Sequence, residues 1–96
     1  MKFAFYFSAR AESELQSTIN FLDKEWGEST ADKFLDKVDE LLNLISESPE
    51  MFVCVNRKRK IHKCVINANV ILFYRIHKNE IEVITFFQSH QHPLKF

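Results

Sequence analysis

Apolar positions follow a helical period in the first half of the chain and a strand pattern in the second. Residues 2–7 are predicted to form a strand. The apolar residues after them are three or four apart: Ala11, Leu15, Ile19, Leu22 and Trp26. This spacing puts them on one face of a helix. Ser8 can cap its start, and Gly27 supplies the left-handed residue that ends it.

A second helix is predicted directly after Gly27. Ser29 and Asp32 have capping-box spacing, and Ser48-Pro49 ends the helix. Its apolar face contains Ala31, Phe34, Leu35, Val38, Leu41, Leu42 and Ile45. Because so short a connection joins the two helices, they should form an antiparallel hairpin.

Short apolar segments separated by turns fill the rest of the chain. We predict strands at 51–55, 61–66, 70–77 and 80–87, with turns at 67–69 and 78–79 where Asn tolerates left-handed geometry. Segment 70–77 is apolar apart from Arg75 and should be the central strand, while strand 2–7 lies at or near an edge. The order predicts an α+β fold, with the helical hairpin on one face of a twisted, mostly antiparallel sheet.

Length and composition favour a single domain over residues 1–96. The chain is 46% hydrophobic and 27% charged, which suits one compact core. No apolar run reaches the ~20 residues of a membrane span, and Arg10 interrupts the faint signal-peptide pattern at the start. Cys54 and Cys64 fall on neighbouring predicted strands; a bridge is geometrically feasible, but free thiols in the cytoplasm are favoured.

Charge is distributed unevenly along the chain. Residues 1–50 contain five Lys and Arg against eleven Asp and Glu, a net charge of −6, whereas residues 51–96 contain eight against two, a net charge of +6. Four consecutive cations, Arg57, Lys58, Arg59 and Lys60, lie between two predicted strands. A basic half suits an anionic partner. The alternatives are that the halves attract each other and that the four cations form only a solvated turn.

Arg75 is the polar exception in the central strand. Alternation places it on one face with Ile71 and Phe73, while Val70, Leu72, Tyr74 and Ile76 share the face better suited to helix packing. On the open face Arg75 could join loop 57–60, His62 or Lys63. Such a cluster suits phosphate binding, because each cation that pairs with a phosphate releases counterions. The alternative is a snorkelling or paired structural arginine.

The second half of the chain contains the residue types that a metal-independent ribonuclease needs. Cleavage needs a base, an acid and cations near the phosphate. His62, His90 or His92 could exchange protons near neutral pH, while Lys63 and Arg75 could stabilise charge.

Metal and cofactor sites are not expected. His90 and His92 could form half of a metal site, completed by Cys64 or His77, but nothing fixes the remaining ligands. Gly27 is the only glycine, which excludes glycine-rich nucleotide-binding loops.

Several segments, in this order, resemble the RelE/ParE superfamily of toxins of type II toxin–antitoxin modules: residues 48–52, 63–67 leading into 72–76, and 86–95. The resemblance covers nearly the whole chain. It implies a small cytoplasmic toxin held inactive by a cognate antitoxin, with a toxin dimer as one arrangement within the complex. Members of the RelE type cut messenger RNA at the ribosome, whereas members of the ParE type inhibit DNA gyrase without catalytic groups of their own.

The departures from the RelE pattern favour the ParE type. Matching on Tyr74, Ile71 stands where RelE-type ribonucleases have an arginine, and His90 stands where many relatives have another. Losing two arginines removes electrostatic stabilisation of the phosphate transition state. We therefore predict gyrase inhibition first, with RelE-like cleavage by His, Lys and Arg side chains as the alternative and a non-toxic antitoxin-binding relative as a further one. Residues 57–60 are the predicted salt-sensitive contact for nucleic acid or an acidic antitoxin segment.

Overall fold

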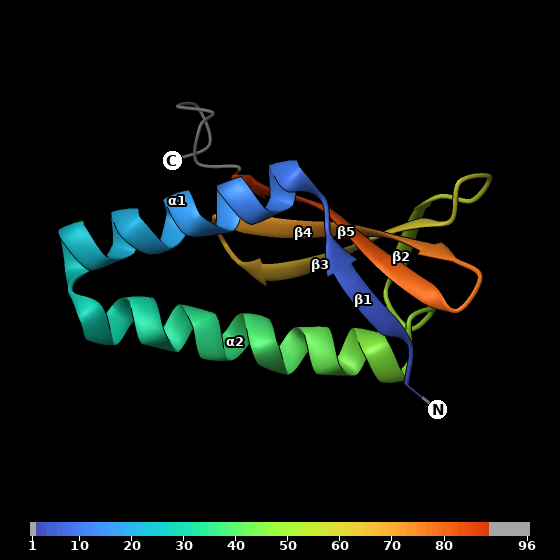
Figure 1. The fold of residues 1–96 in the computed structure, drawn as a ribbon, viewed down its shortest axis with the longest axis horizontal. Coiled ribbons are helices and arrows are strands. Elements are labelled where there is room, and N and C mark those ends of the chain that lie inside the picture. Colours follow the sequence, from blue (N-terminus) through green and yellow to red (C-terminus); the bar gives the residue numbers. More distant parts are fainter. Residues whose placement is uncertain (1, 89–96) are drawn as a thin grey trace.

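The computed structural model describes residues 2–88. Along the chain its elements are β1 (Ala4–Phe7), α1 (Ala9–Trp26), α2 (Glu28–Glu47), β2 (Val53–Asn56), β3 (Ile61–Asn67), β4 (Val70–His77) and β5 (Glu80–Gln88). Figure 1 shows the two long helices running antiparallel beside the sheet. The predicted α+β fold is confirmed. No helix in residues 2–88 is long and apolar enough to cross a membrane.

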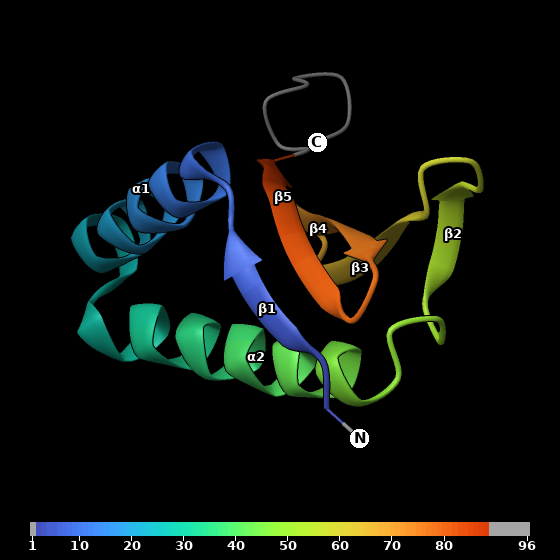
Figure 2. The same ribbon diagram turned by 45° about the vertical axis from the view of Figure 1, so that its right-hand side comes forward.

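The five strands form one sheet in the order β1-β5-β4-β3-β2. β4 lies at the centre and β1 at an edge, as predicted. Strands β2 to β5 pair antiparallel, and β1 pairs parallel with β5. Parallel neighbours require a long connection, and here both helices and three strands intervene. This pairing brings the first and last strands of the chain side by side (Figure 2).

Gly27 joins the two helices and shapes the end of both. Its φ of 99° is positive, and its amide donates to the carbonyls of Leu22 and Asp23. The same residue is the N-cap of α2, which begins at Glu28 without a side-chain cap. The predicted capping box from Ser29 is therefore wrong, because Ser29 already lies inside the helix. Since a Cβ at Gly27 would meet no atom within 4 Å, the backbone conformation alone selects glycine.

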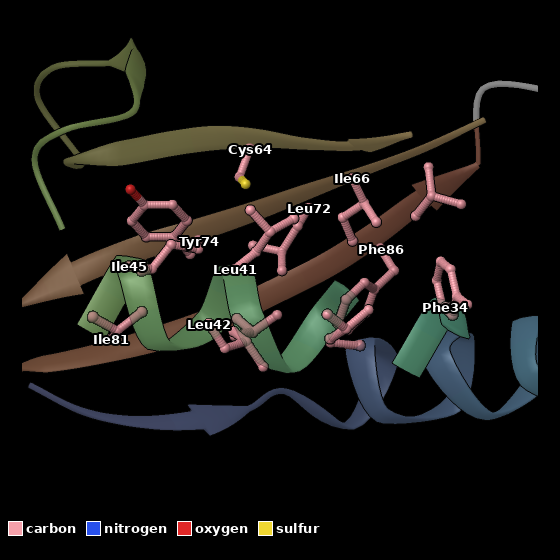
Figure 3. Packing of buried hydrophobic residues seen from close by; sticks show 14 of the residues in the cluster. Phe34, Leu41, Leu42, Ile45, Cys64, Ile66, Leu72, Tyr74, Ile81 and Phe86 are labelled. Carbon is pink, nitrogen blue, oxygen red and sulfur yellow. The ribbon is translucent and has the colours of Figure 1, made fainter. Parts of the chain in front are cut away.

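The core lies between α2 and the sheet. Tyr74, Leu72, Ile81, Val83 and Ile45 are fully or almost fully buried, and Figure 3 shows α2 side chains reaching between those of β3, β4 and β5. The predicted face of β4 is confirmed, because Val70, Leu72, Tyr74 and Ile76 are buried and their neighbours are not. Six of the seven residues of the predicted apolar face of α2 are buried as well, and Leu35 is half-buried.

Trp26 does not belong to the core. It follows the spacing of the predicted apolar face of α1, but it is the last residue of that helix and its side chain is 70% exposed. With Phe21, which is 52% exposed, it lines an apolar hollow of about 420 Å³ between the hairpin and the β3–β4 turn.

The turns differ in detail from the expectation that asparagine would adopt the left-handed conformation. Lys60 and Lys78 have φ of 57°. Asn67 instead closes its turn through its side-chain oxygen, which accepts from the amides of Asn69 and Val70 at 2.7 and 3.0 Å.

Both cysteines are free thiols, Cys54 exposed and Cys64 buried. Cys54 lies opposite His62 on the neighbouring strand rather than opposite Cys64.

Candidate functional site

Arg75 lies on the face of the sheet that the helices leave open. Its Nη2 is 3.2 Å from Oε1 of Glu82, its cross-strand neighbour on β5. The two side chains are 40% and 26% exposed, so the pair lies near the surface rather than in the core. The structure therefore supports the reading of Arg75 as a paired arginine, whose charge is partly balanced by its neighbour.

Apolar side chains surround this ion pair. Phe73 and Phe87 form an edge-to-face contact with ring centroids 6.5 Å apart. Ile71 lies opposite Phe87, and Lys63 lies opposite Phe73. We call this surface the open face and define it by Lys63, Ile71, Phe73, Arg75, Glu82 and Phe87. Uncovered sheet faces with aromatic side chains are common sites of protein contact.

His62 lies on the other face of the sheet. Its ring stacks on that of Tyr74, with centroids 5.4 Å apart and planes inclined by 15°, and the residue is only 6% exposed. Successive residues of a strand point to opposite faces, so the sheet separates His62 from Lys63. The expected cluster of His62 with Lys63 and Arg75 is therefore not formed. Sequence alternation could have shown this, because His62 has the parity of the buried Cys64 and Ile66.

Hydrogen bonds donated by backbone amides fix the shape of the basic loop. The amide of Arg59 donates to the side-chain oxygen of Asn56 at 2.9 Å, and the amide of Lys60 donates to the carbonyl of Arg57 at 3.3 Å. The carbonyl of Lys60 in turn accepts from the amide of Ile76 at 3.1 Å. The loop is thereby tied to both β2 and the end of β4.

A cleft of about 410 Å³ lies beside this loop. It is lined by Glu50, Phe52, Cys54, Arg57, Lys60, His62 and Ile76. Loop residues Arg57 and Lys60 line it, whereas Lys58 and Arg59 do not. The structure thus brings His62 together with two of the four predicted basic residues, on the side of the sheet opposite Arg75.

His90 and His92 lie outside the described residues. Cys64 and His77 are the two alternative residues that the sequence offered to complete a metal site with them. Cys64 is buried opposite Leu72, and His77 is exposed at the end of β4, five residues further along that strand. Burial also raises the pKa of the Cys64 thiol, which disfavours the thiolate form that metals bind.

Glu14 makes a long-range contact that the sequence pattern did not reveal. The register between β4 and β5 shifts between Phe73 and Tyr74 of β4, which marks a bulge in β5. The Glu14 carboxylate accepts from Thr85 Oγ1 at 2.5 Å and from the amide of Phe86 at 3.0 Å, and thereby joins α1 to this bulge. Burial alone would raise the pKa of Glu14, but hydrogen bonds from Thr85, Arg10 and Phe86 outweigh burial and lower it.

The fold and its surfaces define a small α+β protein with an open sheet face on one side and a basic loop between β2 and β3. The family model described as the ParE toxin of the type II toxin–antitoxin system parDE matches residues 5–93. The chain belongs to this family, within the RelE/ParE superfamily. Comparison with curated protein sequences gives no match.

Solved structures of toxins share this fold at low sequence identity. A chromosomal ParDE toxin–antitoxin system from P. aeruginosa matches with a TM-score of 0.75 and 10% identity, over 91% of this chain and 96% of that one. The E. coli DinJ–YafQ toxin–antitoxin complex matches with a TM-score of 0.64 and 8% identity, over 96% and 98%. A mutant of E. coli toxin RelE in the free state matches with a TM-score of 0.64 and 16% identity, over 99% and 92%.

Proposed function

We propose that this chain is a cytoplasmic toxin that inhibits DNA gyrase by binding it, and that a cognate antitoxin neutralises the toxin. The observation that carries the proposal is the match of the ParE family model to residues 5–93. The fold similarity to toxins solved as antitoxin complexes supports the antitoxin partner. A toxin dimer within the complex stays a prediction, as does the absence of a cofactor.

The positions of the candidate catalytic residues favour inhibition by binding over RNA cleavage. A ribonuclease needs its proton-transfer groups and its cations around one phosphate. Here His62 is buried against Tyr74 on the helix side, whereas Lys63 and Arg75 lie on the open face. Arg75 is also engaged by Glu82. RelE-like cleavage would therefore depend on His90 and His92 and remains the alternative.

The open face is the surface that we assign to the target. It presents the edge-to-face pair of Phe73 and Phe87 beside the charged Lys63 and Arg75. Aromatic groups next to cations are typical of the energetically important residues of protein interfaces. The helices pack on the opposite face, so neither helix covers this one (Figure 2).

The first experiment follows DNA and protein synthesis by pulse labelling after the chain is induced without its antitoxin. We expect DNA synthesis to fall first. Purified chain should then inhibit supercoiling by gyrase and trap cleaved DNA that appears after detergent and protease treatment. Protein synthesis falling first, with new messenger RNA ends, would establish the RelE-like alternative. Unchanged synthesis of both would identify a non-toxic antitoxin-binding relative.

Charge reversal tests the assigned surface. Lys63→Glu reverses a charge on the open face, and Lys33→Glu makes the same charge change on the exposed side of α2. We expect the first variant to require about tenfold more protein for half-inhibition of supercoiling, equivalent to ~1.4 kcal/mol of lost binding energy. The second should behave like the parent chain. Equal effects of both variants would rule out the open face as the contact surface.

A further inference from the structure

The cleft beside loop 57–60 contains two cations that form no ion pair with another residue of 2–88. The ion pairs within residues 2–88 are Arg10–Glu14 and Arg75–Glu82. Arg57 and Lys60 therefore line the cleft without a salt-bridge partner in this part of the chain, although Glu50 lines the same cleft. Such cations are ready to bind an anionic group from outside.

The base of the cleft is rigid and partly polar. Tyr74 anchors it, because its ring stacks on His62 and its hydroxyl donates to the carbonyl of Pro49 at 2.5 Å. Nδ1 of His62 lies 3.4 Å from the carbonyl oxygen of Lys60.

The remaining wall is apolar. Phe52 packs edge-on against Tyr74 with ring centroids 6.5 Å apart, and Ile76 lines the cleft near the end of β4. The ligand must therefore combine an anionic group with an apolar one. Counting Arg57 and Lys60 against Glu50, the lining has a single net positive charge, which one carboxylate balances.

We propose that this cleft binds an acidic peptide segment, with one Asp or Glu carboxylate between Arg57 and Lys60 and the adjoining apolar side chain against Phe52. Identifying the segment as part of the neutralising antitoxin rests on the function proposed above. The peptide chemistry rests only on the cleft. Charge steers the segment to the loop, and burial of the apolar side chain holds it there.

The experiment is an NMR titration of the full chain with two blocked tripeptides, acetyl-Leu-Glu-Leu-amide and acetyl-Leu-Gln-Leu-amide. We expect the Glu peptide to shift amide signals of residues 50–62 and 76 saturably. The Gln peptide should bind about tenfold more weakly, because it lacks the charge. Equal binding of both peptides, or no saturable shift with either, would overturn the proposal. Tighter binding of inorganic phosphate at the same residues would also overturn it, in favour of a phosphate site.

The loop supplies its own matched control. Arg57→Ala/Lys60→Ala and Lys58→Ala/Arg59→Ala remove the same charge from the same loop, but only the first pair lines the cleft. We expect the first double variant to lose discrimination between the Glu and Gln peptides and the second to keep it. If both double variants lost this discrimination equally, the peptide would be attracted to the loop as a whole, and the proposal of a binding site in the cleft would be overturned. The titration contains neither gyrase nor antitoxin, so failure of the proposed function would leave its result unaffected.

Discussion

Replacing Glu14 with Ala should destabilise the protein by about 2 kcal/mol. The carboxylate accepts from Thr85 Oγ1 and the Phe86 amide, both partly buried, and from Arg10 at the surface. Hydrogen bonds to a charged group contribute roughly 1.5–3 kcal/mol each when buried. The side chain of Glu14 is 27% exposed and that of Arg10 is 70% exposed, so water can replace part of these bonds, and the surface pair adds only about 0.3 kcal/mol. Alanine also regains a few tenths of a kcal/mol in helix propensity.

Urea denaturation of the parent chain and the variant measures this free energy. A loss of about 2 kcal/mol at an unchanged slope lowers the midpoint by roughly 1 M and the melting temperature by roughly 10 °C. Glu12→Ala, which changes an exposed residue in the first turn of the same helix, is the control and should change stability by less than about 0.5 kcal/mol. Equal midpoints for the two variants would refute the assignment of Glu14 as the link between α1 and β5.

The pH dependence gives a second test of the same contact. The pKa of Glu14 is lowered in the folded protein from its ordinary value of 4.5, so the unfolded chain binds the proton more tightly. The stability that ionised Glu14 contributes is therefore fully present above its ordinary pKa of 4.5, and it is lost as the pH falls through the lowered pKa of the folded protein. The stability difference between parent and Glu14→Ala should be smaller at pH 3 than at pH 7, and a constant difference would contradict this reasoning.

Two further predictions concern buried groups. Tyr74→Phe should cost about 1–2 kcal/mol in urea denaturation, because the Pro49 carbonyl loses its donor. Burial, and to a lesser extent Cys64 and Cys54, raises the pKa of Tyr74, so the parent should lose stability above pH 10 faster than the variant; parallel losses would count against this explanation. A chromogenic disulfide reagent should modify Cys54 quickly and Cys64 only on unfolding, and two fast equivalents would show that Cys64 is accessible.

Local periodicity accounts for the parts of the fold that were predicted correctly. The alternation in 70–77 fixed both the strand and its buried face, since one-residue slips would expose Leu72 and Tyr74. The spacing of apolar residues in α2 did the same for that helix. In both segments the residues that specify the structure are neighbours along the chain, so the sequence displays the pattern directly.

Contacts between distant residues account for what was missed. Glu14 is a surface-type residue in a helical pattern, and its partners Thr85 and Phe86 are more than seventy positions away. Nothing local indicates the bulge that lies next to Thr85. Trp26 has the helical spacing of the apolar face of α1, but it is the last residue of that helix and its side chain stays 70% exposed. The side of His62 was in principle predictable from alternation, whereas its stack on Tyr74 depends on strand register.

The separation of charge along the sequence becomes a separation in space. The α1–α2 turn and the β2–β3 loop lie at opposite ends of the molecule (Figure 1). If the acidic and basic halves served to hold each other together, ion pairs would join helices to strands. The ion pairs of residues 2–88 instead lie within α1 and between β4 and β5, and the halves meet through the apolar core and the Glu14 contact. The positive charge of the β2–β3 loop is thus left for partners, and an acidic segment approaching the toxin would be attracted to the basic end and repelled by the helices.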